Sequence, residues 1–205
     1  MPKFSIIIPA HNSAGFIEKA LQSVRKQTYT DYELIVVCDA CTDYTARVAM
    51  NFADRIIQTE YGRDGLARNA GLDAAQGEYV LFLDDDDWYL HENVLLNIMI
   101  MTKYASNAKI LCFGFLWRTV GITGPVNPSG GIWPNVWSKC WKRSFIGETR
   151  FGDEYMESDL HFTKKMLGKI TNWEKEIYMT MMPIVYYNYM REGSQTELEA
   201  RKHDS

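Results

Sequence analysis

Short hydrophobic runs alternate with amphipathic stretches along the first half of the chain. Each run consists mostly of β-branched or other apolar side chains, and a polar cluster follows it. The expected strands are residues 4–8, 33–37, 55–58 and 79–83, and the expected helices between them are residues 16–24, 45–51 and 65–75. This alternation is typical of a mainly parallel α/β sheet, in which ligands bind beyond the carboxyl ends of the strands.

The periodicity weakens in the second half of the chain. The pattern predicts a helix at residues 91–104 and a strand at 110–116. Residues 119–134 are rich in Gly and Pro, so we expect a loop there that could cover an active site. A further helix is expected at 158–167 and a strand at 184–189. For the first helix of the chain, Asn12 or Ser13 is the expected cap.

Composition narrows the class of protein. The chain has 205 residues, of which 46% are hydrophobic and 23% charged, so it is long enough and apolar enough to fold around its own core. The net charge of −4 gives no overall attraction for nucleic acid. No apolar run approaches the roughly 20 residues of a membrane span, and no leader is recognisable, so we expect a cytoplasmic protein that can act at a membrane surface.

Four cysteines are too few for a disulfide framework in a chain of this size. Cys38 and Cys41 form a C-x-x-C pair, which leaves a redox pair or half of a zinc site as alternatives. No second C-x-x-C follows, so neither alternative is favoured.

An acidic run follows the most apolar of the expected strands. Asp84, Asp85, Asp86 and Asp87 would repel one another unless a cation is bound or some of them stay protonated. Magnesium and manganese prefer oxygen ligands and are often held by one or two carboxylates plus substrate phosphates. A solvated acidic turn is the alternative, although the run directly abuts a buried strand. The sequence therefore favours a divalent cation at this position.

Other polar side chains lie near strand ends. Asp39 ends the second expected strand, where a carboxylate can accept hydrogen bonds from a base or a ribose hydroxyl, or else cap a helix. Arg63 and Arg68 lie in the segment that leads to the fourth strand, and a guanidinium there could pair with diphosphate oxygens. Each arginine alone is more often a surface charge.

Four segments in this order resemble the successive motifs of glycosyltransferase family 2. They are residues 5–12 (SIIIPAHN), 34–43 (LIVVCDACTD), 67–71 (ARNAG) and 77–88 (GEYVLFLDDDDW). The resemblance implies the GT-A fold, a Rossmann-like and mainly parallel sheet flanked by helices. It also implies a nucleotide-diphospho-sugar donor and transfer with inversion. Residues 1–118 would bind the nucleotide sugar, and residues 119–205 would form the smaller acceptor-binding and catalytic-base region of the same domain.

The resemblance assigns roles to individual residues. Asp39 would bind the base, Arg68 would lie near the diphosphate, and Asp84 would lie towards the ribose. Where the family commonly has Asp-Asp-Gly-Ser, this chain has residues 38–41 as CDAC, so the base is left open although UDP is expected. The full set expected to contact the donor is Pro9, Ala10, Asn12, Asp39, Arg68, Asp84 and Asp85.

The same resemblance implies a D-x-D metal site for Mn²⁺ or Mg²⁺. Asp86 would be the main metal ligand and Asp84 a further one. A late histidine completes the metal shell in some GT-A enzymes, and here either His161 or His203 could do so. Each histidine taken alone more often has a structural or solvated role.

The expected catalytic base lies in the second half. Residues 137–143 (WSKCWKR) and 157–162 (ESDLHF) look similar to the acceptor-side segment of many family members, in which a Glu-Asp pair opens a helix and the aspartate is the base. Here Ser158 replaces the glutamate, so Asp159 is the expected base and Glu157 the reserve. The alternative for Asp159 is a carboxylate that stabilises the helix amino terminus.

Two alternatives to a glycosyltransferase remain open. A sugar-nucleotidyltransferase would need a glycine-rich triphosphate loop after the first strand, which residues 9–15 lack. A non-catalytic nucleotide-sugar-binding module is the second alternative, because of the change to Ser158. The acceptor could be a glycan, a lipid-linked saccharide or another hydroxyl compound. Trp133, Trp137 and Trp141 are spaced by four, which on a helix would form one aromatic stripe, either core or a surface for a sugar.

Overall fold

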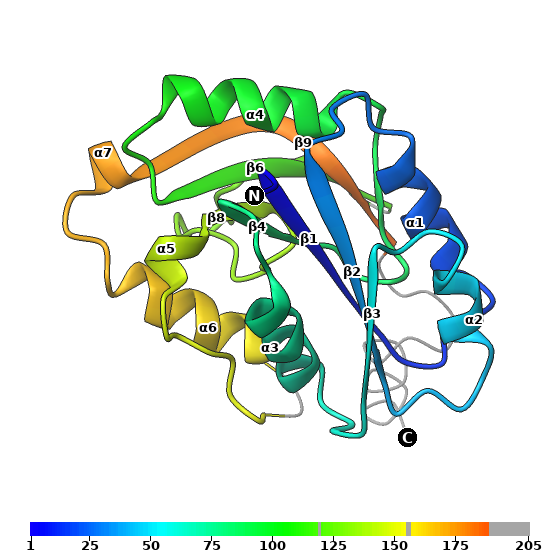
Figure 1. Cartoon of the computed structure of the whole chain (residues 1–205). Coiled ribbons are helices and arrows are strands. Elements are labelled where there is room, and N and C mark those ends of the chain that lie inside the picture. The colour runs from blue at the N-terminus through cyan, green and yellow to red at the C-terminus, as the bar shows by residue number, and fades with distance from the viewer. Residues whose placement is uncertain (119, 155–156, 189–205) are drawn as a thin grey trace.

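The computed structural model describes residues 1–118, 120–154 and 157–188, which form one nine-stranded mixed sheet with helices on both faces (Figure 1). The strand order is β3-β2-β1-β4-β8-β6-β9-β5, with β7 paired to β6. The strands are β1 (Phe4–Ala10), β2 (Tyr32–Asp39), β3 (Arg55–Thr59), β4 (Tyr79–Phe82), β5 (Trp88–Tyr89), β6 (Ile110–Trp117), β7 (Gly121–Thr123), β8 (Lys139–Lys142) and β9 (Ile177–Tyr187). The helices are α1 (Ile17–Arg25), α2 (Thr45–Ala49), α3 (Asp64–Ala74), α4 (Val94–Tyr104), α5 (Arg143–Ile146), α6 (Ser158–Leu167) and α7 (Trp173–Glu176).

The parallel half of the sheet confirms the predicted alternation. Strands β1 to β4 are parallel neighbours, and every residue of β1 and β4 is buried because helices cover both faces. The strand expected at 4–8 extends to Ala10 and includes Pro9. The carbonyl of Ile7 accepts a hydrogen bond from the N–H of Leu83, so the backbone polar groups of Ile7 point towards β4. The backbone of Pro9, two residues further on, points the same way but lies beyond the last residue of β4. Its missing N–H therefore costs the sheet no hydrogen bond.

The second half departs from the expected parallel order. Strand β8 runs antiparallel between β4 and β6, so the sheet is mixed. The prediction missed β8, because its four residues read KCWK, a pattern too short to show a period. It also missed the two-residue strand β5 and the four-residue helix α7. The expected loop at 119–134 contains β7, which pairs with β6. The strand expected at 184–189 begins earlier, at Ile177, and the helix expected at 91–104 begins at Val94.

The expected aromatic stripe does not form. Trp133 and Trp137 lie in the segment before β8, and Trp141 lies within β8, so the three side chains share no helix face. Trp141 is fully buried and Trp137 is 5% exposed, which places both in the core. Burying a large apolar side chain contributes roughly 1.5–3 kcal/mol, so both rings stabilise the core.

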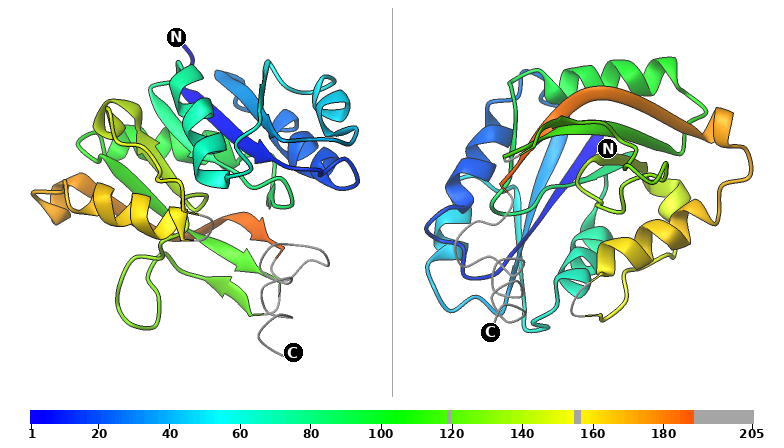
Figure 2. Two further views of the ribbon diagram at one scale, coloured as in Figure 1. Left: turned by 90° about the horizontal axis from the view of Figure 1, so that it is seen from below. Right: turned by 180° about the vertical axis from the view of Figure 1, so that it is seen from behind.

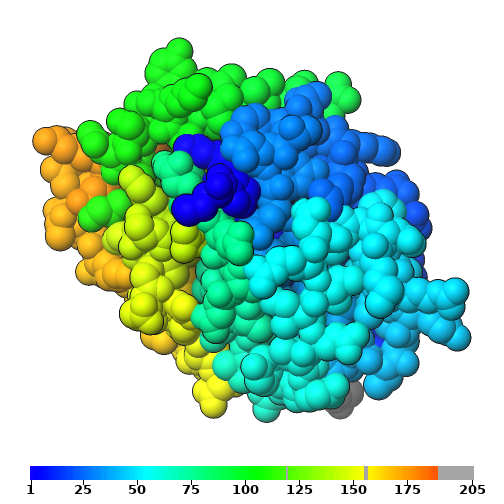
Figure 3. Space-filling model, in the orientation of Figure 1, coloured from blue at the N-terminus to red at the C-terminus, as the bar shows by residue number. Residues whose placement is uncertain are grey.

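Two hydrophobic layers sandwich the sheet. Helices α1, α2 and α4 cover one face, and α3, α5 and α6 cover the other (Figures 1 and 2). Helices α3 and α6 are far apart in the sequence but lie side by side (Figure 3). Phe151 and Phe162 stack beneath them with ring centroids 4.0 Å apart. No described helix is long and apolar enough to cross a membrane.

Small residues allow α3 to approach its neighbours closely. A Cβ on Gly71 would lie 2.4 Å from Cγ2 of Ile7 in β1, so the helix packs against the sheet at this glycine. A Cβ on Gly65 would lie 2.8 Å from the carbonyl of Gly152. Asn69 exchanges two hydrogen bonds with the backbone of Phe151, at 3.0 and 2.9 Å. The ARNAG segment thus joins the parallel half of the sheet to the segment that leads into α6.

The expected cap of α1 is wrong. Phe16 is the N-cap residue and makes no side-chain cap hydrogen bond. The backbone carbonyl of Ser13 accepts from the N–H groups of Phe16 and Ile17 instead. The side chain of Asn12 accepts from the backbone N–H of Thr42 at 2.8 Å, so it ties the end of β1 to the loop after β2.

Candidate functional site

Polar side chains gather at the carboxyl edge of the parallel strands. Asp39 ends β2, and Asp84 follows β4 by two residues. The backbone N–H of His11, just after β1, donates to Asp85 Oδ2 at 3.4 Å. Adjacent parallel strands end at the same edge, which brings together groups that are 74 residues apart in sequence.

Arg68 is the centre of this site. Its side chain is 3% exposed and lies on α3. The guanidinium pairs with Asp64, with Asp84 at 2.8 Å from Nη2, and with Asp159 at 3.4 Å from Nη1. The three carboxylates come from α3, from the end of β4 and from α6, so the arginine joins residues of the first half of the chain to α6 in the second half. The structure brings together three predicted site residues, Arg68, Asp84 and Asp159.

The site carries more negative charge than one arginine can balance. Burial, with added repulsion from Asp64, Asp159 and Asp86, raises the pKa of Asp84 to about 8 despite the attraction of Arg68. Burial and repulsion from Asp159 likewise raise the pKa of Asp64, although Arg68 opposes them. The surrounding carboxylates outweigh the cost of burial for Arg68 and raise its pKa. An added cation would relieve this repulsion.

Asp87 is the most deeply buried member of the acidic run. It is 1% exposed, and its Oδ1 accepts from the backbone N–H of Asn188 at 2.8 Å. Its Oδ2 is buried without a hydrogen-bond partner among the described residues. Burial and repulsion from Asp84 and Asp86 raise the pKa of Asp87 well above the usual range. Asp87 thus connects the acidic run to the end of β9.

Asp39 is buried and its two oxygens are engaged by the loop before α3. Oδ1 accepts from the Thr59 hydroxyl at 2.9 Å and from the Tyr61 N–H at 2.7 Å. Oδ2 accepts from the N–H of Arg63 at 2.9 Å. A carboxylate offers about four lone-pair positions, so one acceptor position remains for a ligand. The predicted contact with the base stays a prediction, and the described contacts show Asp39 ordering this loop.

The loops after β1 and β2 contain left-handed backbone. Asn12 has φ +48° and Ala40 has φ +49°. Asparagine tolerates this region, but alanine does so at a cost of roughly 1 kcal/mol. The family commonly has glycine at the position of Ala40. Pro9 and Ala10 have buried side chains, so they can border a ligand only through their backbone, and Ala10 O already accepts from the Cys41 thiol at 3.3 Å.

Asp159 lies in the first turn of α6, as the sequence predicts. Its Oδ2 accepts from the backbone N–H of Val136 at 3.0 Å, while Oδ1 lies near Arg68. Glu157 precedes the helix, is exposed, and has φ +66°. The structure thus brings Asp159, and not Glu157, into contact with Arg68.

Sequence reasoning missed Asp64. This residue opens α3 and pairs with Arg68 one turn later, at spacing i, i+4. A D-x-x-x-R spacing on a helix is the signal that could have indicated the pair. That Arg68 also reaches Asp159 depends on the packing of α3 against α6, which the sequence alone does not show.

The donor chemistry of the site fits a divalent cation. The acidic run supplies carboxylate oxygens, and burial and the neighbouring carboxylates raise the pKa of Asp84 to about 8, so an added positive charge would favour its ionised form. Among the described residues, no three His, Cys, Asp or Glu side chains are grouped to hold a metal by themselves. The protein would therefore supply one or two ligands, and a bound phosphate the others, as is common for magnesium.

The predicted histidine ligands find no support at the acidic run. His161 pairs through Nδ1 with Glu154 at 2.9 Å. His203 lies outside the described residues. The C-x-x-C cysteines are free thiols, and burial raises the pKa of Cys38 to about 12, which does not suit a reactive thiol.

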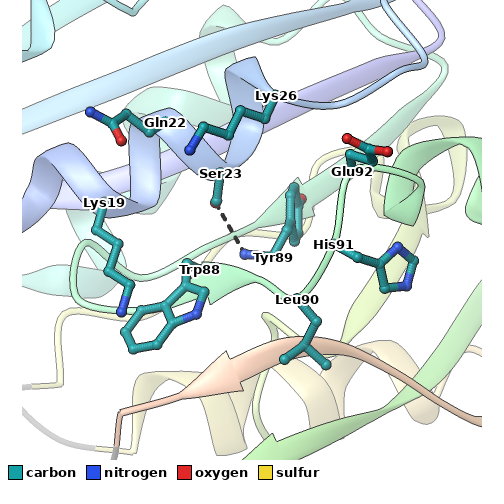
Figure 4. A pocket seen from close by; sticks show the side chains of 9 residues that line it. All are labelled: Lys19, Gln22, Ser23, Lys26, Trp88, Tyr89, Leu90, His91 and Glu92. Carbon is teal, nitrogen blue, oxygen red and sulfur yellow. Dashed lines mark hydrogen bonds between the residues drawn. The ribbon is translucent and has the colours of Figure 1, made fainter.

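A shallow pocket of about 260 Å³ lies between α1 and the segment after the acidic run (Figure 4). Lys19 covers the ring of Trp88, with its Nζ 3.1 Å from the ring centroid, and Ser23 accepts from the N–H of Tyr89. Lining residues come from α1 and from residues 88–92. The pocket does not include the acidic run or Asp159, so it is separate from the carboxylate cluster.

Comparison with known proteins indicates the family of this chain. Residues 5–145 match the family described as "Glycosyl transferase family 2". The glycosyltransferase GlyA of Streptococcus pneumoniae is 27% identical over 204 residues, which cover 91% of this chain and 29% of GlyA. The poly(ribitol-phosphate) β-N-acetylglucosaminyltransferase TarS of Staphylococcus aureus is 37% identical over 103 residues, which cover 46% of this chain and 18% of TarS.

Solved structures share the fold. Residues 1–349 of S. aureus TarS in complex with UDP-GlcNAc match with a TM-score of 0.80 at 23% identity, over 95% of this chain and 60% of that one. The mannosyltransferase PcManGT from Pyrobaculum calidifontis in complex with GDP-Man and Mn²⁺ matches with a TM-score of 0.75 at 19% identity, over 98% of this chain and 61% of that one. These matches confirm the predicted GT-A fold. The chain spans between 18% and 36% of the length of the curated relatives it matches.

Proposed function

The chain belongs to glycosyltransferase family 2, and on this premise we propose that it transfers a sugar from a UDP-linked donor to a hydroxyl acceptor, with inversion and with the help of a divalent cation. One observation carries the proposal: Arg68 holds the carboxylates of Asp84 and Asp159 within a single cluster at the carboxyl edge of the sheet. The acidic run suits the donor's cation, and Asp159 suits the acceptor's proton. The two parts of a transfer site are therefore adjacent.

The donor would lie along the ends of β1, β2 and β4. Asp39 would accept a hydrogen bond from the base at its remaining acceptor position. Its present contacts would keep the loop before α3 in place. Pro9, Ala10 and Asn12 would border the nucleotide, and Asp84 and Asp85 would lie near the ribose and diphosphate. The complex of TarS with UDP-GlcNAc supports a UDP-linked donor, although the CDAC segment departs from the common family motif.

Asp86 would hold the cation, with Asp84 as a second ligand. A divalent cation bound there would neutralise charge that develops on the departing diphosphate. Loss of the Asp84 proton on cation binding fits its pKa of about 8, which burial and neighbouring carboxylates raise. The Mn²⁺ complex of PcManGT supports this choice of cation.

Arg68 differs from the expectation in one respect. Its side chain is 3% exposed and faces three carboxylates, so its present contacts are with the protein. We infer that it keeps these three carboxylates in place relative to one another. It would also stabilise negative charge on the leaving diphosphate through its nearby positive charge.

Asp159 would act as general base. Its carboxylate is 24% exposed and is oriented by the N–H of Val136, so one oxygen can take the proton of an acceptor hydroxyl as that hydroxyl attacks the anomeric carbon. Attack on the face opposite the nucleotide gives inversion. The acceptor class that we propose is a glycan or a lipid-linked saccharide, because a relative from Campylobacter jejuni, 43% identical over 95 residues, is named as a GalNAc(5)-diNAcBac-PP-undecaprenol β-1,3-glucosyltransferase.

The experiment combines the protein with Mn²⁺, a panel of nucleotide sugars and glycan acceptors, and measures nucleoside diphosphate release and the anomeric configuration of the product. We expect release above the uncatalysed rate and an inverted product from one class of donor. Asp86→Ala should lose most of this activity, and equal turnover by wild type and variant would contradict the metal site. Donor binding without release by the wild type would identify a non-catalytic binding module.

A further inference from the structure

Lys139 is a buried lysine that the proposed reaction does not yet use. It lies in β8, between β4 and β6 in the middle of the sheet, and it is 1% exposed. Lysine is almost never fully buried unless its charge is compensated. Here the ammonium donates to the carbonyl of Trp133 at 2.6 Å, to the carbonyl of Asn135 and to Asn135 Oδ1 at 3.2 Å. All three of its N–H groups are therefore directed at one short segment.

Residues 133–136, which we call the 133–136 loop, are held at every carbonyl. Lys139 holds those of Trp133 and Asn135. The hydroxyl of Thr163 on α6 donates to the carbonyl of Pro134 at 2.5 Å. The indole N–H of Trp141 donates to the carbonyl of Val136 at 3.3 Å. The loop thus has little freedom to move relative to β8 and α6.

One N–H of this loop reaches the site. The backbone N–H of Val136 donates to Asp159 Oδ2 at 3.0 Å. Apart from the ion pair with Arg68, this bond is the described contact that sets the direction of the Asp159 carboxylate. A shift of the loop by about 1 Å would turn or release that carboxylate, and misplacements of this size can cost on the order of 100-fold in rate.

We propose that Lys139 is a positioning residue for the general base: its buried ammonium fixes the 133–136 loop, and the loop holds Asp159 in the orientation that accepts the proton. This inference rests on the proposed function. It requires no contact between Lys139 and either substrate, so it predicts an effect on kcat while the KM for the donor stays the same.

The charge state of Lys139 should also affect how kcat depends on pH. Burial lowers the pKa of Lys139 to about 8, and the nearby Cys112 and Asp159 oppose that change. Cys112, which faces Lys139 across the β6–β8 pair, stays neutral in this range because burial raises its pKa to about 11. On losing its proton, Lys139 keeps two N–H donors for three acceptors. At saturating donor, kcat should therefore fall as the pH rises through about 8.

The test compares Lys139→Met with the wild type and with Lys164→Met, an exposed lysine on α6 that serves as the matched control. The concentration of folded enzyme is counted by donor binding, and kcat and the donor KM are measured from pH 6 to 9. We expect Lys139→Met to lower kcat about 10- to 100-fold at pH 7, with the donor KM within twofold. Its kcat should lack the fall around pH 8 that the wild type and Lys164→Met both show.

A kcat within twofold of the wild type, or an unchanged fall above pH 8 in Lys139→Met, would overturn the role of Lys139. If Lys139→Met does not fold, Asn135→Ala removes one acceptor of the ammonium and keeps the lysine. That variant should lower kcat several-fold at constant KM, and an unchanged kcat would again overturn the inference. A wild type that releases no nucleoside diphosphate contradicts the proposed function instead, so the two failures are distinguishable.

Discussion

The carboxylates at the two edges of the parallel sheet are held in opposite ways. At the amino edge, Glu33 accepts from the Ser5 hydroxyl at 2.5 Å and from the N–H of Gln76 at 2.6 Å, in a site that is 9% exposed. Neutral donors satisfy this carboxylate. At the carboxyl edge, Asp64, Asp84 and Asp159 share one arginine. The first arrangement closes the fold, whereas the second leaves negative charge that a cation and a substrate can use.

The largest expected effect comes from Asp159→Asn. The amide has nearly the same shape and can still accept from Val136, but it cannot take a proton from the acceptor. We expect transfer to fall about 10²- to 10⁴-fold, while nucleotide-sugar binding, measured by calorimetry, changes less than threefold. Transfer at the wild-type rate would move the base to Glu157 or to another residue, and Glu157→Gln is the matched control.

At the amino edge, replacing the carboxylate of Glu33 should lower the stability of the fold and leave kcat unchanged. Glu33→Leu removes the acceptor of the buried Ser5 hydroxyl and of the partly buried N–H of Gln76, which should lower the free energy of unfolding by about 1–3 kcal/mol. Urea unfolding measures this, and Glu33→Gln, which keeps an acceptor oxygen, should cost less. A loss of kcat per folded molecule in Glu33→Leu would show that the two edges are not independent.

How far the sequence predicts the structure follows the same division. Strands β1, β2 and β4 were predictable because strands buried on both faces read as continuous apolar runs. Strand β8 was not predictable from the sequence. Its four residues are too few to show a period, and its buried Lys139 looks like a surface residue in the sequence. The contacts of Arg68 with Asp64 and Asp159 depend on how α3 packs against α6, which no local pattern encodes.

Asp84 should make stability depend on pH. Burial and neighbouring carboxylates raise its folded-state pKa to about 8 from an ordinary value of 3.8, so between these values the folded state binds more protons than the unfolded state. Its contribution therefore lowers the free energy of unfolding as the pH rises from about 4 to 8. Asp84→Asn should remove this fall in the free energy of unfolding.

We expect Asp84→Asn to match the wild type near pH 4 and to exceed it at pH 8 by on the order of 1 kcal/mol, measured by urea unfolding without metal. A variant that is less stable than the wild type at pH 8 would show that the ion pair with Arg68 outweighs the crowding. Asp73→Asn on the exposed end of the same helix as Arg68 is the control for general charge effects.

The smallest effect should come from Ala40→Gly in the loop after β2. Glycine relieves the left-handed conformation of Ala40, and the gain is offset in part by the greater freedom of glycine in the unfolded chain. We expect a change in the free energy of unfolding of about 1 kcal/mol or less, in the stabilising direction. Destabilisation by more than about 1 kcal/mol would mean that the methyl group of Ala40 makes packing contacts that matter more than the backbone.

We propose that a nucleotide sugar binds at the carboxyl edge through a cation held at the acidic run. Calorimetric titration of the wild type and of Asp86→Asn with UDP and UDP-linked sugars, each with Mn²⁺ and with a chelator, measures this binding. We expect the affinity of the wild type to weaken at least tenfold when the metal is removed, and Asp86→Asn to bind weakly in both conditions. Equal affinity in all four combinations would mean that no cation at the acidic run takes part in donor binding.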